Sequence, residues 1–260
     1  MRHGESLGNV DEGAYVTTPD WRVPLTEIGR EQAYEAGKEL KDIIGENGKV
    51  FFYYSPYKRT RDTLDELRHH IKPEQIISTR EEPRISEQQF GNFQNMEAVW
   101  QSKQERHEFG RFYYRFKEGE AGLDVYSRVS SFISTLVRDC QQYQKAGYDL
   151  DEVNVVIITH GLSLRLFLMR WFQFSVEEFE DSENPQNAQL IVMKKKCYGG
   201  HRWYELQEKH RKALNLPKWC TKPKVSELHL LRSLFYLLHD QSHLLTITGI
   251  PAIAFFPTRT

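Results

Sequence analysis

The sequence predicts an α/β fold in which helices flank a mostly parallel central sheet. Two observations favour it. Short apolar runs typical of buried strands alternate with amphipathic helical patterns, and chemically distinctive motifs stand where those strands end. The length of 260 residues and the 39% hydrophobic content suit one globular domain with a large core, or one domain with a tail.

The expected elements follow in chain order. TEIGREQAYEAGKELKDIIG at 26–45 has a threonine that can cap a helix, apolar residues at helical spacing and a closing glycine, so we expect a helix. VFFYYSP at 50–56 predicts a buried strand that ends at Ser-Pro. A long amphipathic helix is expected at 124–144. VNVVIITHG at 153–161 gives the strongest strand signal, with a helix after it, and QLIVM at 189–193 indicates another strand.

Cysteine usage and hydropathy indicate the compartment. The cysteines, Cys140, Cys197 and Cys220, are too few and too scattered for a disulfide framework, so we expect a reducing, cytoplasmic location. The histidines and cysteines between 197 and 220 have spacings that fit no usual zinc finger, and no metal site is predicted. The apolar segment 244–256 is shorter than the roughly 20 residues of a spanning helix, so we expect no membrane span.

The charge is uneven although the net charge is only −1. Residues 194–224 contain ten Lys or Arg against two Glu. Such a stretch can bind anions, nucleic acid or a membrane surface, but we favour a solvated tail of low order and expect no nucleic-acid partner. Residues 225–240 have the pattern of an amphipathic helix. We therefore predict a domain over 1–193 and a basic, then apolar, C-terminal tail of uncertain fold over 194–260.

Four motifs carry the chemistry, and each lies in a loop or where a strand ends. They are RHG at 2–4, SPYKRTRDT at 55–63, SEQQFG at 86–91 and THG at 159–161. Because the carboxyl ends of parallel strands meet at one edge of a sheet, we expect all four motifs to converge on one site.

Phosphoryl transfer through histidine explains why these residue types occur together. A histidine nitrogen can attack phosphorus and hold the phosphoryl group. The charge on the phosphoryl oxygens suits the planar donor forks of Arg2 and Arg59. His160 stands at a helix start, where free N–H groups favour an anion, and Glu87 is the carboxylate best placed to protonate a leaving oxygen.

The motifs R-H-G-E-S-x-G-N, S-P-Y-K-R-T, E-Q-Q-F-G and T-H-G-x-S-L-R resemble, in this order, those of the histidine phosphatase superfamily, in its phosphoglycerate-mutase-like branch. The stretches SPYKRTRDTL, EQQFGNFQ, FGRFYYRF, DVYSRVSSF and HGLSLRLFLMRWF are similar to plant phosphoglycerate-mutase-like proteins, and the resemblance covers residues 2–193. It implies a small phosphorylated substrate and no metal or organic cofactor. It also implies the residue roles: His3 as nucleophile, Glu87 as proton donor, and Arg2, Asn9, Arg59 and His160 as phosphate ligands.

The sequence departs from the glycolytic mutases of that family. Gln88 stands where an arginine usually follows the acid, Leu162 where an asparagine usually follows the second His-Gly, and TTPDWRVPLT replaces the Thr-Gly-Trp stretch. These changes remove polar groups that would hold a carboxylate substrate, and they favour a hydrolase over a mutase with the same intermediate. A catalytically degenerate binding protein is the second alternative. The substrate and the oligomeric state stay open.

Two segments next to these motifs differ from the rest of the chain. Family members have several apolar residues before Arg-His-Gly, where this chain has only Met1. We therefore expect a first strand that is largely missing, an N-terminally shortened chain and a poorly held His3. Residues 95–118, polar and then rich in arginine and aromatics, are expected to form an insertion or lid over the end of the sheet.

Overall fold

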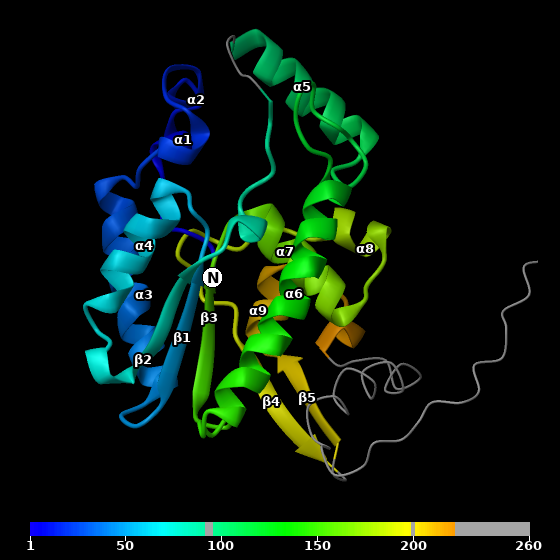
Figure 1. Cartoon of the computed structure of the whole chain (residues 1–260). Helices are drawn as coiled ribbons and strands as arrows, with labels where there is room; N and C mark the ends of the chain where they lie inside the picture. The colour runs from blue at the N-terminus through cyan, green and yellow to red at the C-terminus, as the bar shows by residue number, and fades with distance from the viewer. Residues whose placement is uncertain (92–95, 199–200, 222–260) are drawn as a thin grey trace, which may run out of the picture. The chain divides into compact units, whose positions relative to one another are not determined.

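The computed structural model describes residues 1–91, 96–198 and 201–221, and it contains a three-stranded parallel sheet (Figure 1). Strand β1 (Lys49–Tyr54) lies in the middle, with β2 (Ile76–Glu81) on one side and β3 (Val153–Ile158) on the other. The strands predicted at 50–56 and at 153–161 are therefore confirmed. The α/β class with a parallel sheet is confirmed as well.

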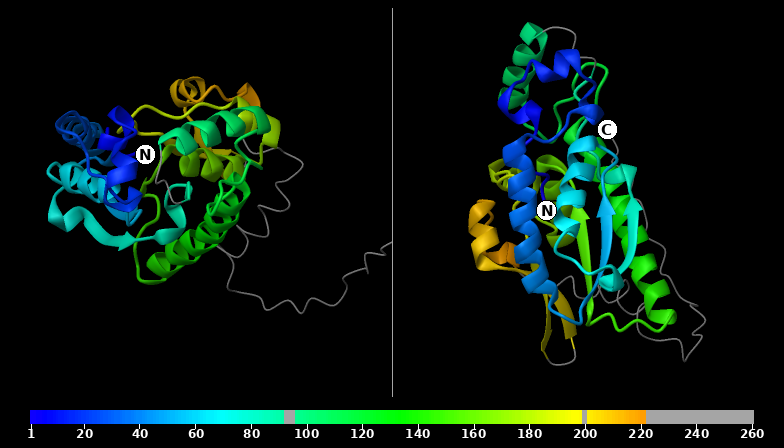
Figure 2. Two further views of the ribbon diagram at one scale, coloured as in Figure 1. Left: turned by 90° about the horizontal axis from the view of Figure 1, so that it is seen from above. Right: turned by 90° about the vertical axis from the view of Figure 1, so that its left-hand side faces the viewer.

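Helices cover both faces of this sheet (Figures 1 and 2). Helices α3 (Glu27–Ile44) and α4 (Lys58–Arg68) pack on one face, and α6 (Gly122–Lys145) and α7 (Gly161–Phe172) pack on the other. The helices predicted at 26–45 and 124–144 correspond to α3 and α6.

The two faces of β1 explain this layering. Side chains of a strand point alternately to opposite faces. Val50 and Phe52 accordingly join the core under α3 and α4, whereas Phe51 and Tyr53 join the core under α6 and α7. All four side chains are fully buried, which stabilises the fold by roughly 1.5–3 kcal/mol each. A strand buried on both faces has the uninterrupted apolar run seen in this part of the sequence.

The ends of α3 show how local sequence sets an element. The side-chain oxygen of Thr26 accepts a hydrogen bond of 3.0 Å from the backbone N–H of Gly29, which caps the helix start. The helix ends at Gly45, whose φ of +71° is a conformation that favours glycine.

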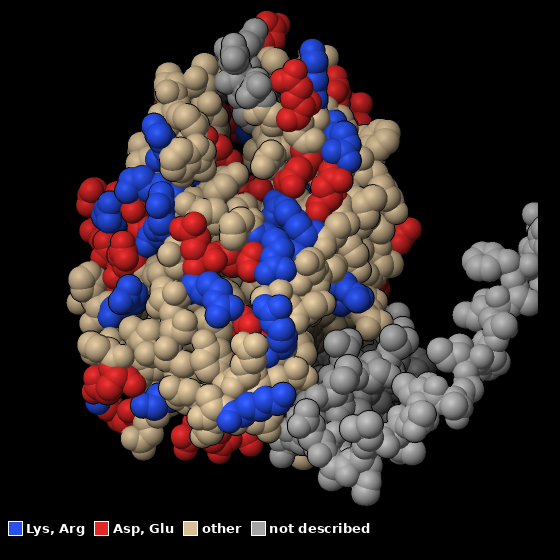
Figure 3. All heavy atoms as spheres, viewed as in Figure 1, with Lys and Arg blue, Asp and Glu red and all other residues tan. Residues whose placement is uncertain are grey.

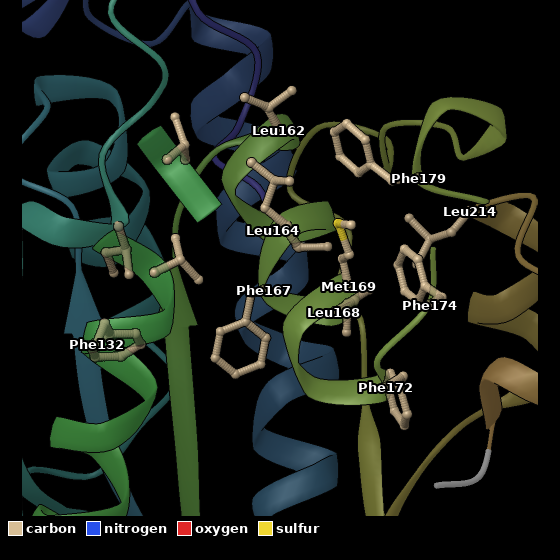
Figure 4. Close-up of a cluster of buried hydrophobic side chains, with 14 of the residues drawn as sticks. Phe132, Leu162, Leu164, Phe167, Leu168, Met169, Phe172, Phe174, Phe179 and Leu214 are labelled. Atoms are coloured by element: carbon tan, nitrogen blue, oxygen red, sulfur yellow. The ribbon is translucent and has the colours of Figure 1, made fainter. Parts of the chain in front are cut away.

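The larger core centres on α7, whose side chains are almost all buried (Figure 4). Phe179 from α8 (Val176–Asp181) packs there. So does Leu214, which follows α9 (Glu208–Ala213). The described part of the segment after residue 193 thus contributes to the main core.

An antiparallel hairpin of β4 (Met193–Tyr198) and β5 (His201–Leu206) precedes α9. The strand predicted at 189–193 is wrong except for its last residue, because Leu190 is buried by packing without entering a sheet.

The first residues run beside β3 without forming a strand. Arg2 makes one isolated parallel bridge with Thr159. The N–H of His3 donates to the carbonyl oxygen of Thr159 at 3.0 Å, and the N–H of Ala188 donates to the carbonyl oxygen of His3 at 2.9 Å. Both backbone groups of His3 are therefore held, so the expectation that His3 is poorly held is wrong.

Short helices stand beyond the carboxyl ends of the strands. Helices α1 (Leu7–Val10) and α2 (Ala14–Thr17) lie on one side there, and α5 (Met96–Phe109) from the predicted lid lies on the other (Figure 1). The remaining elements are short 3-10 helices: η1 (Asp20–Arg22), η2 (Pro73–Gln75), η3 (Pro83–Ile85) and η4 (Lys218–Thr221).

Among the described residues, no helix has both the length and the apolar character that a membrane crossing requires. The segments 225–240 and 244–256 singled out in the sequence lie outside the described residues. On the face seen in Figure 3, lysine and arginine are interspersed with aspartate and glutamate.

Candidate active site

The carboxyl ends of β1 and β3 bring the first, second and fourth motifs together. The N–H of His3 bonds to Thr159 at the end of β3, and the N–H of Ser55 donates to the carbonyl oxygen of Ile158 at 3.1 Å. The imidazole rings of His3 and His160 consequently lie 5.3 Å apart between centroids, at an angle of 60°. Both side chains are buried.

The imidazole of His3 is held in one tautomer. Its Nδ1 lies 2.6 Å from the carbonyl oxygen of Gly4, and a carbonyl oxygen can only accept, so Nδ1 carries the hydrogen. The lone pair is then on Nε2, which has no hydrogen-bond partner among the residues that the structure describes. Burial, together with the nearby cations Arg59 and Arg2, lowers the pKa of His3 well below its usual range. His3 is thus a neutral imidazole with a free nitrogen.

Two glycines allow the loop after His3 to be tight. A Cβ atom at Gly29 would stand 1.9 Å from the carbonyl oxygen of Glu5, and one at Gly4 would stand 2.3 Å from that of Gly29. The N–H of Gly4 donates to the hydroxyl of Thr63 on α4 at 3.0 Å. The start of α3 and one face of α4 therefore position His3.

His160 precedes the first residue of α7 and is bound to the end of β1. Its Nε2 lies 2.9 Å from the hydroxyl of Ser55, and its ring packs edge-on against Tyr57 at 5.0 Å. Its Nδ1 is buried, and no described residue forms a hydrogen bond with it. Burial and the charge of Arg59 lower the pKa of His160 well below its usual range. Ser55 is fully buried, so its role is to orient His160.

Arg59 lies in the first turn of α4 and is almost completely buried. Its guanidinium donates to the side-chain carboxylate of Asp20 at 2.7 Å and stacks over the ring of Tyr57 at 4.8 Å. Burial opposes the charge, but Asp20, Tyr15 and Glu87 together raise the pKa of Arg59. The guanidinium therefore stays charged inside the site.

Arg2 adds a second guanidinium, which donates to the carbonyl oxygen of Pro185 at 2.8 Å. Its Nε is buried and lacks a hydrogen-bond partner among residues 1–91, 96–198 and 201–221. Burial and the neighbouring Arg59 lower the pKa of Arg2, whereas the carboxyl group of Glu87 raises it. Arg2 and Arg59 both lie within the electrostatic influence of Glu87. The hydroxyl of Thr159 donates to the carbonyl oxygen of Ile85 at 2.6 Å, so the third motif begins beside the fourth.

Glu87 stands in the loop after η3 and receives a hydrogen bond of 3.0 Å from the N–H of Gln88. Burial is the main reason that the pKa of Glu87 is raised, and Asp20 raises it further. Arg59 and Arg106 act in the opposite direction. Glu87 therefore retains its proton to a higher pH than an ordinary carboxyl group does.

Asn9, in α1, is exposed and connected to His3 only indirectly. Its side-chain oxygen accepts from the N–H of Ser6 at 3.0 Å and from the amide of Asn187 at 3.1 Å. The same amide of Asn187 donates to the carbonyl oxygen of His3 at 3.3 Å. These bonds leave the amide nitrogen of Asn9 without a partner in the described part of the chain.

Three arginines of the predicted lid, residues 95–118, lie in different environments. Arg106, on α5, lies within electrostatic influence of Glu87 and packs over the ring of Phe116 at 5.6 Å. Arg115 forms an ion pair of 2.7 Å with Asp124. Arg111 donates to the carbonyl oxygen of Glu180 at 3.3 Å.

Sequence reasoning missed several residues that the structure places in or around the site. Ser55 belongs to a recognised motif, but its partner His160 is 105 positions away. Asp20 belongs to a stretch noted only for its departure from the mutases. Tyr57 and Arg128 belong to stretches that carry the resemblance, but no role was expected for them. No sequence signal pointed to Tyr15 or Asn187. Within the described residues, no group of three or more His, Cys, Asp or Glu side chains is arranged to hold a metal ion.

The sequence profile of the histidine phosphatase superfamily (branch 1) matches residues 1–207. The chain belongs to the histidine phosphatase superfamily. This histidine phosphatase superfamily member is 50% identical over 201 residues to phosphoglycerate mutase-like protein AT74H of Arabidopsis thaliana, covering 74% of this chain and 72% of that protein. It is 48% identical over 198 residues to phosphoglycerate mutase-like protein AT74 of the same plant, covering 74% of this chain and 63% of that protein. The resemblance found in the motifs is confirmed.

More distant relatives include phosphatases. The chain is 28% identical over 282 residues to broad-range acid phosphatase DET1 of Saccharomyces cerevisiae, covering 74% of this chain and 83% of that protein. A solved structure of mycobacterial glucosyl-3-phosphoglycerate phosphatase with VO3 is 20% identical, with a TM-score of 0.59. The match covers 79% of this chain and 94% of that one. Mycobacterial hydrolase 1 is also 20% identical, with a TM-score of 0.61 and the same coverage. These structures share the fold. Family membership and these relatives support an enzyme of phosphatase or mutase type.

Proposed function

We propose that this histidine phosphatase superfamily member hydrolyses a phosphate monoester through a phosphohistidine formed on His3. The observation that carries the proposal is the state of the His3 imidazole. Its Nδ1 hydrogen is bound to Gly4, its Nε2 lone pair is free of hydrogen bonds in the described structure, and its pKa is lowered well below the usual range. A neutral, oriented histidine is a nucleophile.

Unpaired nitrogens beside His3 match the oxygens of a phosphoryl group. Nε of Arg2 and Nδ1 of His160 are buried and have no hydrogen-bond partner in the described parts of the chain. Leaving such groups unpaired costs about 1–3 kcal/mol each. Phosphoryl oxygens would accept hydrogen bonds from both, and Arg59 and the amide nitrogen of Asn9 are further donors. Charge on the transferring group would be stabilised by these fixed donors.

In the first step, Nε2 of His3 attacks phosphorus while the bond from phosphorus to the ester oxygen breaks. The phosphoryl group is then held on Nε2, and the leaving oxygen takes the proton of Glu87 to give the alcohol. The raised pKa of Glu87 suits this role, because the acid must hold its proton until the leaving oxygen needs it.

In the second step, a water molecule attacks phosphorus, and the carboxylate of Glu87 takes a proton from that water. The N–P bond breaks and its electron pair returns to Nε2 of His3. Inorganic phosphate leaves and Glu87 is protonated again. One ester and one water therefore give one alcohol and one phosphate.

The surroundings of Gln88 and Leu162 support water as the acceptor. By the resemblance, these positions carry polar groups in the glycolytic mutases. Leu162, near the start of α7, is buried in the larger core. Gln88 is fully buried and donates to the carbonyl oxygen of Glu120 at 2.8 Å. Neither side chain supplies a charged group to a carboxylate substrate or to a second acceptor alcohol.

The test is release of phosphate from 4-nitrophenyl phosphate by the wild type, by His3→Ala and by the control His69→Ala. We expect His3→Ala to lose activity by roughly 10³-fold or more, since it removes the nucleophile. His69 is an exposed residue after α4, so its variant should retain activity. Acid-labile phosphate on the wild type, absent from His3→Ala, would identify the intermediate.

Three results would contradict the proposal. Equal activity in the wild type and His3→Ala would exclude His3 as the nucleophile. Binding of inorganic phosphate without turnover of any aryl phosphate would indicate the degenerate binding protein. Interconversion of phosphoglycerates without release of phosphate would indicate the mutase.

A further inference from the structure

One side chain binds the backbone of the loop that carries Glu87 at three carbonyl oxygens. Arg128, on α6, donates from one terminal nitrogen to the carbonyl oxygens of Arg84 and Ser86, both at 2.8 Å. Its other terminal nitrogen donates to the carbonyl oxygen of Glu87 itself at 2.9 Å. One guanidinium thus holds three carbonyl oxygens at and before the proposed acid.

Glu120 completes this arrangement from the other side of Glu87. Its carboxylate accepts from Nε and from a terminal nitrogen of Arg128 at 3.0 and 2.9 Å, a bidentate pair. The N–H of Gln89 donates to the same carboxylate at 3.0 Å, and the side-chain amide of Gln88 donates to the carbonyl oxygen of Glu120 at 2.8 Å. Arg128 and Glu120 therefore hold the loop on both sides of Glu87. We call this pair the Arg128–Glu120 clamp.

The charges of Arg128 and Glu120 are directed at each other and not at the carboxyl group of Glu87. Arg128 and Glu120 are both largely buried, with side-chain exposures of 19% and 20%, and they neutralise each other. The positive charge of Arg128 is directed to Glu120, while Glu87 offers it only a backbone carbonyl. The guanidinium can thus fix the position of Glu87 without stabilising its ionised form, which agrees with the raised pKa of Glu87.

We propose that Arg128, with Glu120, is a positioning residue that fixes the carboxyl group of Glu87 for proton transfer to the leaving oxygen. This inference rests on the proposed function, in which Glu87 is the acid. Proton transfer requires the donor within hydrogen-bond distance of the leaving oxygen, and a displacement of about 1 Å can cost roughly 10²-fold in rate.

The variant that tests the clamp is Arg128→Lys. Lysine keeps the charge, but its single ammonium group cannot donate to three carbonyl oxygens and to both oxygens of a carboxylate at the same time. The loop has further anchors, because the hydroxyls of Thr159 and Ser163 donate to the carbonyl oxygens of Ile85 and Ser86, both at 2.6 Å. We therefore expect the variant to fold, which a thermal unfolding curve beside the wild type checks.

The deciding measurement compares two substrates. Glycerol phosphate releases an alkoxide that must be protonated, whereas 4-nitrophenyl phosphate releases a stable phenolate. For Arg128→Lys we expect kcat/KM, which reports the first step, to fall roughly 10- to 100-fold on glycerol phosphate and by no more than about threefold on 4-nitrophenyl phosphate. The comparison uses kcat/KM because Glu87 acts in the second step with both substrates alike. Inhibition by inorganic phosphate should not change, since the phosphate ligands are untouched. Glu120→Gln should show the same pattern more weakly.

Matched variants separate the explanations. Arg115→Lys changes an arginine that pairs with Asp124 at the start of the same helix, and it should behave as wild type on both substrates. Glu87→Gln should show the same split between substrates, and adding Arg128→Lys to it should cause no further loss on glycerol phosphate.

The proposal is overturned if Arg128→Lys lowers kcat/KM equally on both substrates, or on neither, while Glu87→Gln shows the split. If Glu87→Gln shows no split while His3→Ala is inactive, the acid assignment fails and the positioning role fails with it, although the phosphohistidine stands. Activity that survives His3→Ala overturns the proposed function instead. The failures of the two proposals are therefore distinguishable.

Discussion

The guanidinium of Arg59 donates a hydrogen bond of 2.7 Å to the side-chain carboxylate of Asp20, and the same nitrogen donates to the backbone carbonyl oxygen of Asp20 at 2.9 Å. The Arg59 side chain is buried, whereas Asp20 is partly exposed. The protein therefore supplies its own anion to the arginine proposed to bind phosphate. A phosphoryl group must share Arg59 with this carboxylate or displace it.

We predict that Asp20→Asn strengthens the inhibition by inorganic phosphate. Removing the carboxylate removes a competitor for Arg59 and a negative charge that repels phosphate. The expected decrease in the inhibition constant is roughly tenfold, which corresponds to about 1.4 kcal/mol. The control is Glu12→Gln, because Glu12 is an exposed carboxylate that pairs with Lys103. An unchanged or higher inhibition constant for Asp20→Asn would show that Asp20 does not compete.

The pH dependence of kcat/KM should be bell-shaped, with its maximum at acidic pH. His3 must be neutral to attack, and its pKa lies well below 6.5, so activity is lost only at low pH. Glu87 must be protonated to act, and its pKa is raised above 4.5, so activity falls as the pH rises through that raised value. The measurement is kcat/KM for glycerol phosphate against pH.

Glu87→Gln provides the internal check on this profile. Glutamine cannot supply a proton, so we expect activity on glycerol phosphate to fall by roughly 10²- to 10⁴-fold and the descending limb to disappear. The ascending limb should remain, since it reports His3. An intact descending limb in this variant would assign that limb to another group.

Ser55→Ala should weaken the site without unfolding the protein. The hydroxyl of Ser55 is the hydrogen-bond partner of Nε2 of His160, and its loss leaves the ring free to turn. We expect kcat/KM for 4-nitrophenyl phosphate to fall roughly tenfold, with a stability loss of about 1 kcal/mol. Ser127→Ala, which removes a hydroxyl bonded to the carbonyl oxygen of Leu123 in its own helix, should change neither. Full activity in Ser55→Ala would mean that packing alone orients His160.

Gly29→Ala should disturb both the fold and the site. The added methyl group would stand 1.9 Å from the carbonyl oxygen of Glu5, so α3 and the loop after His3 must separate. We expect the free energy of unfolding in urea to fall by about 1–3 kcal/mol, with lower activity. The control is Gly13→Ala, whose methyl group would meet only the carboxylate of Asp11 at 3.0 Å. Wild-type stability in Gly29→Ala would contradict the close approach.

Strand β1 and helix α3 were predictable because their signals are local or periodic. A strand buried on both faces needs an apolar residue at every position, as in the run from Val50 to Tyr53. The cap at Thr26 and the stop at Gly45 depend on neighbours within one turn. The run 189–193 was misread because burial alone does not distinguish a strand from a packed coil, and Leu190 is buried without a ladder partner.

By itself, the sequence determined the α/β class, the family and the motif residues that meet at the end of the sheet. Only the tertiary structure decided which groups hold those residues. Asp20 meets Arg59 across 39 positions, Arg128 meets the carbonyl of Arg84 across 44, and Asn187 meets that of His3 across 184. No spacing rule connects such pairs. A hydrogen bond between them depends on how helices and loops pack on the sheet, and that packing is set by the whole core.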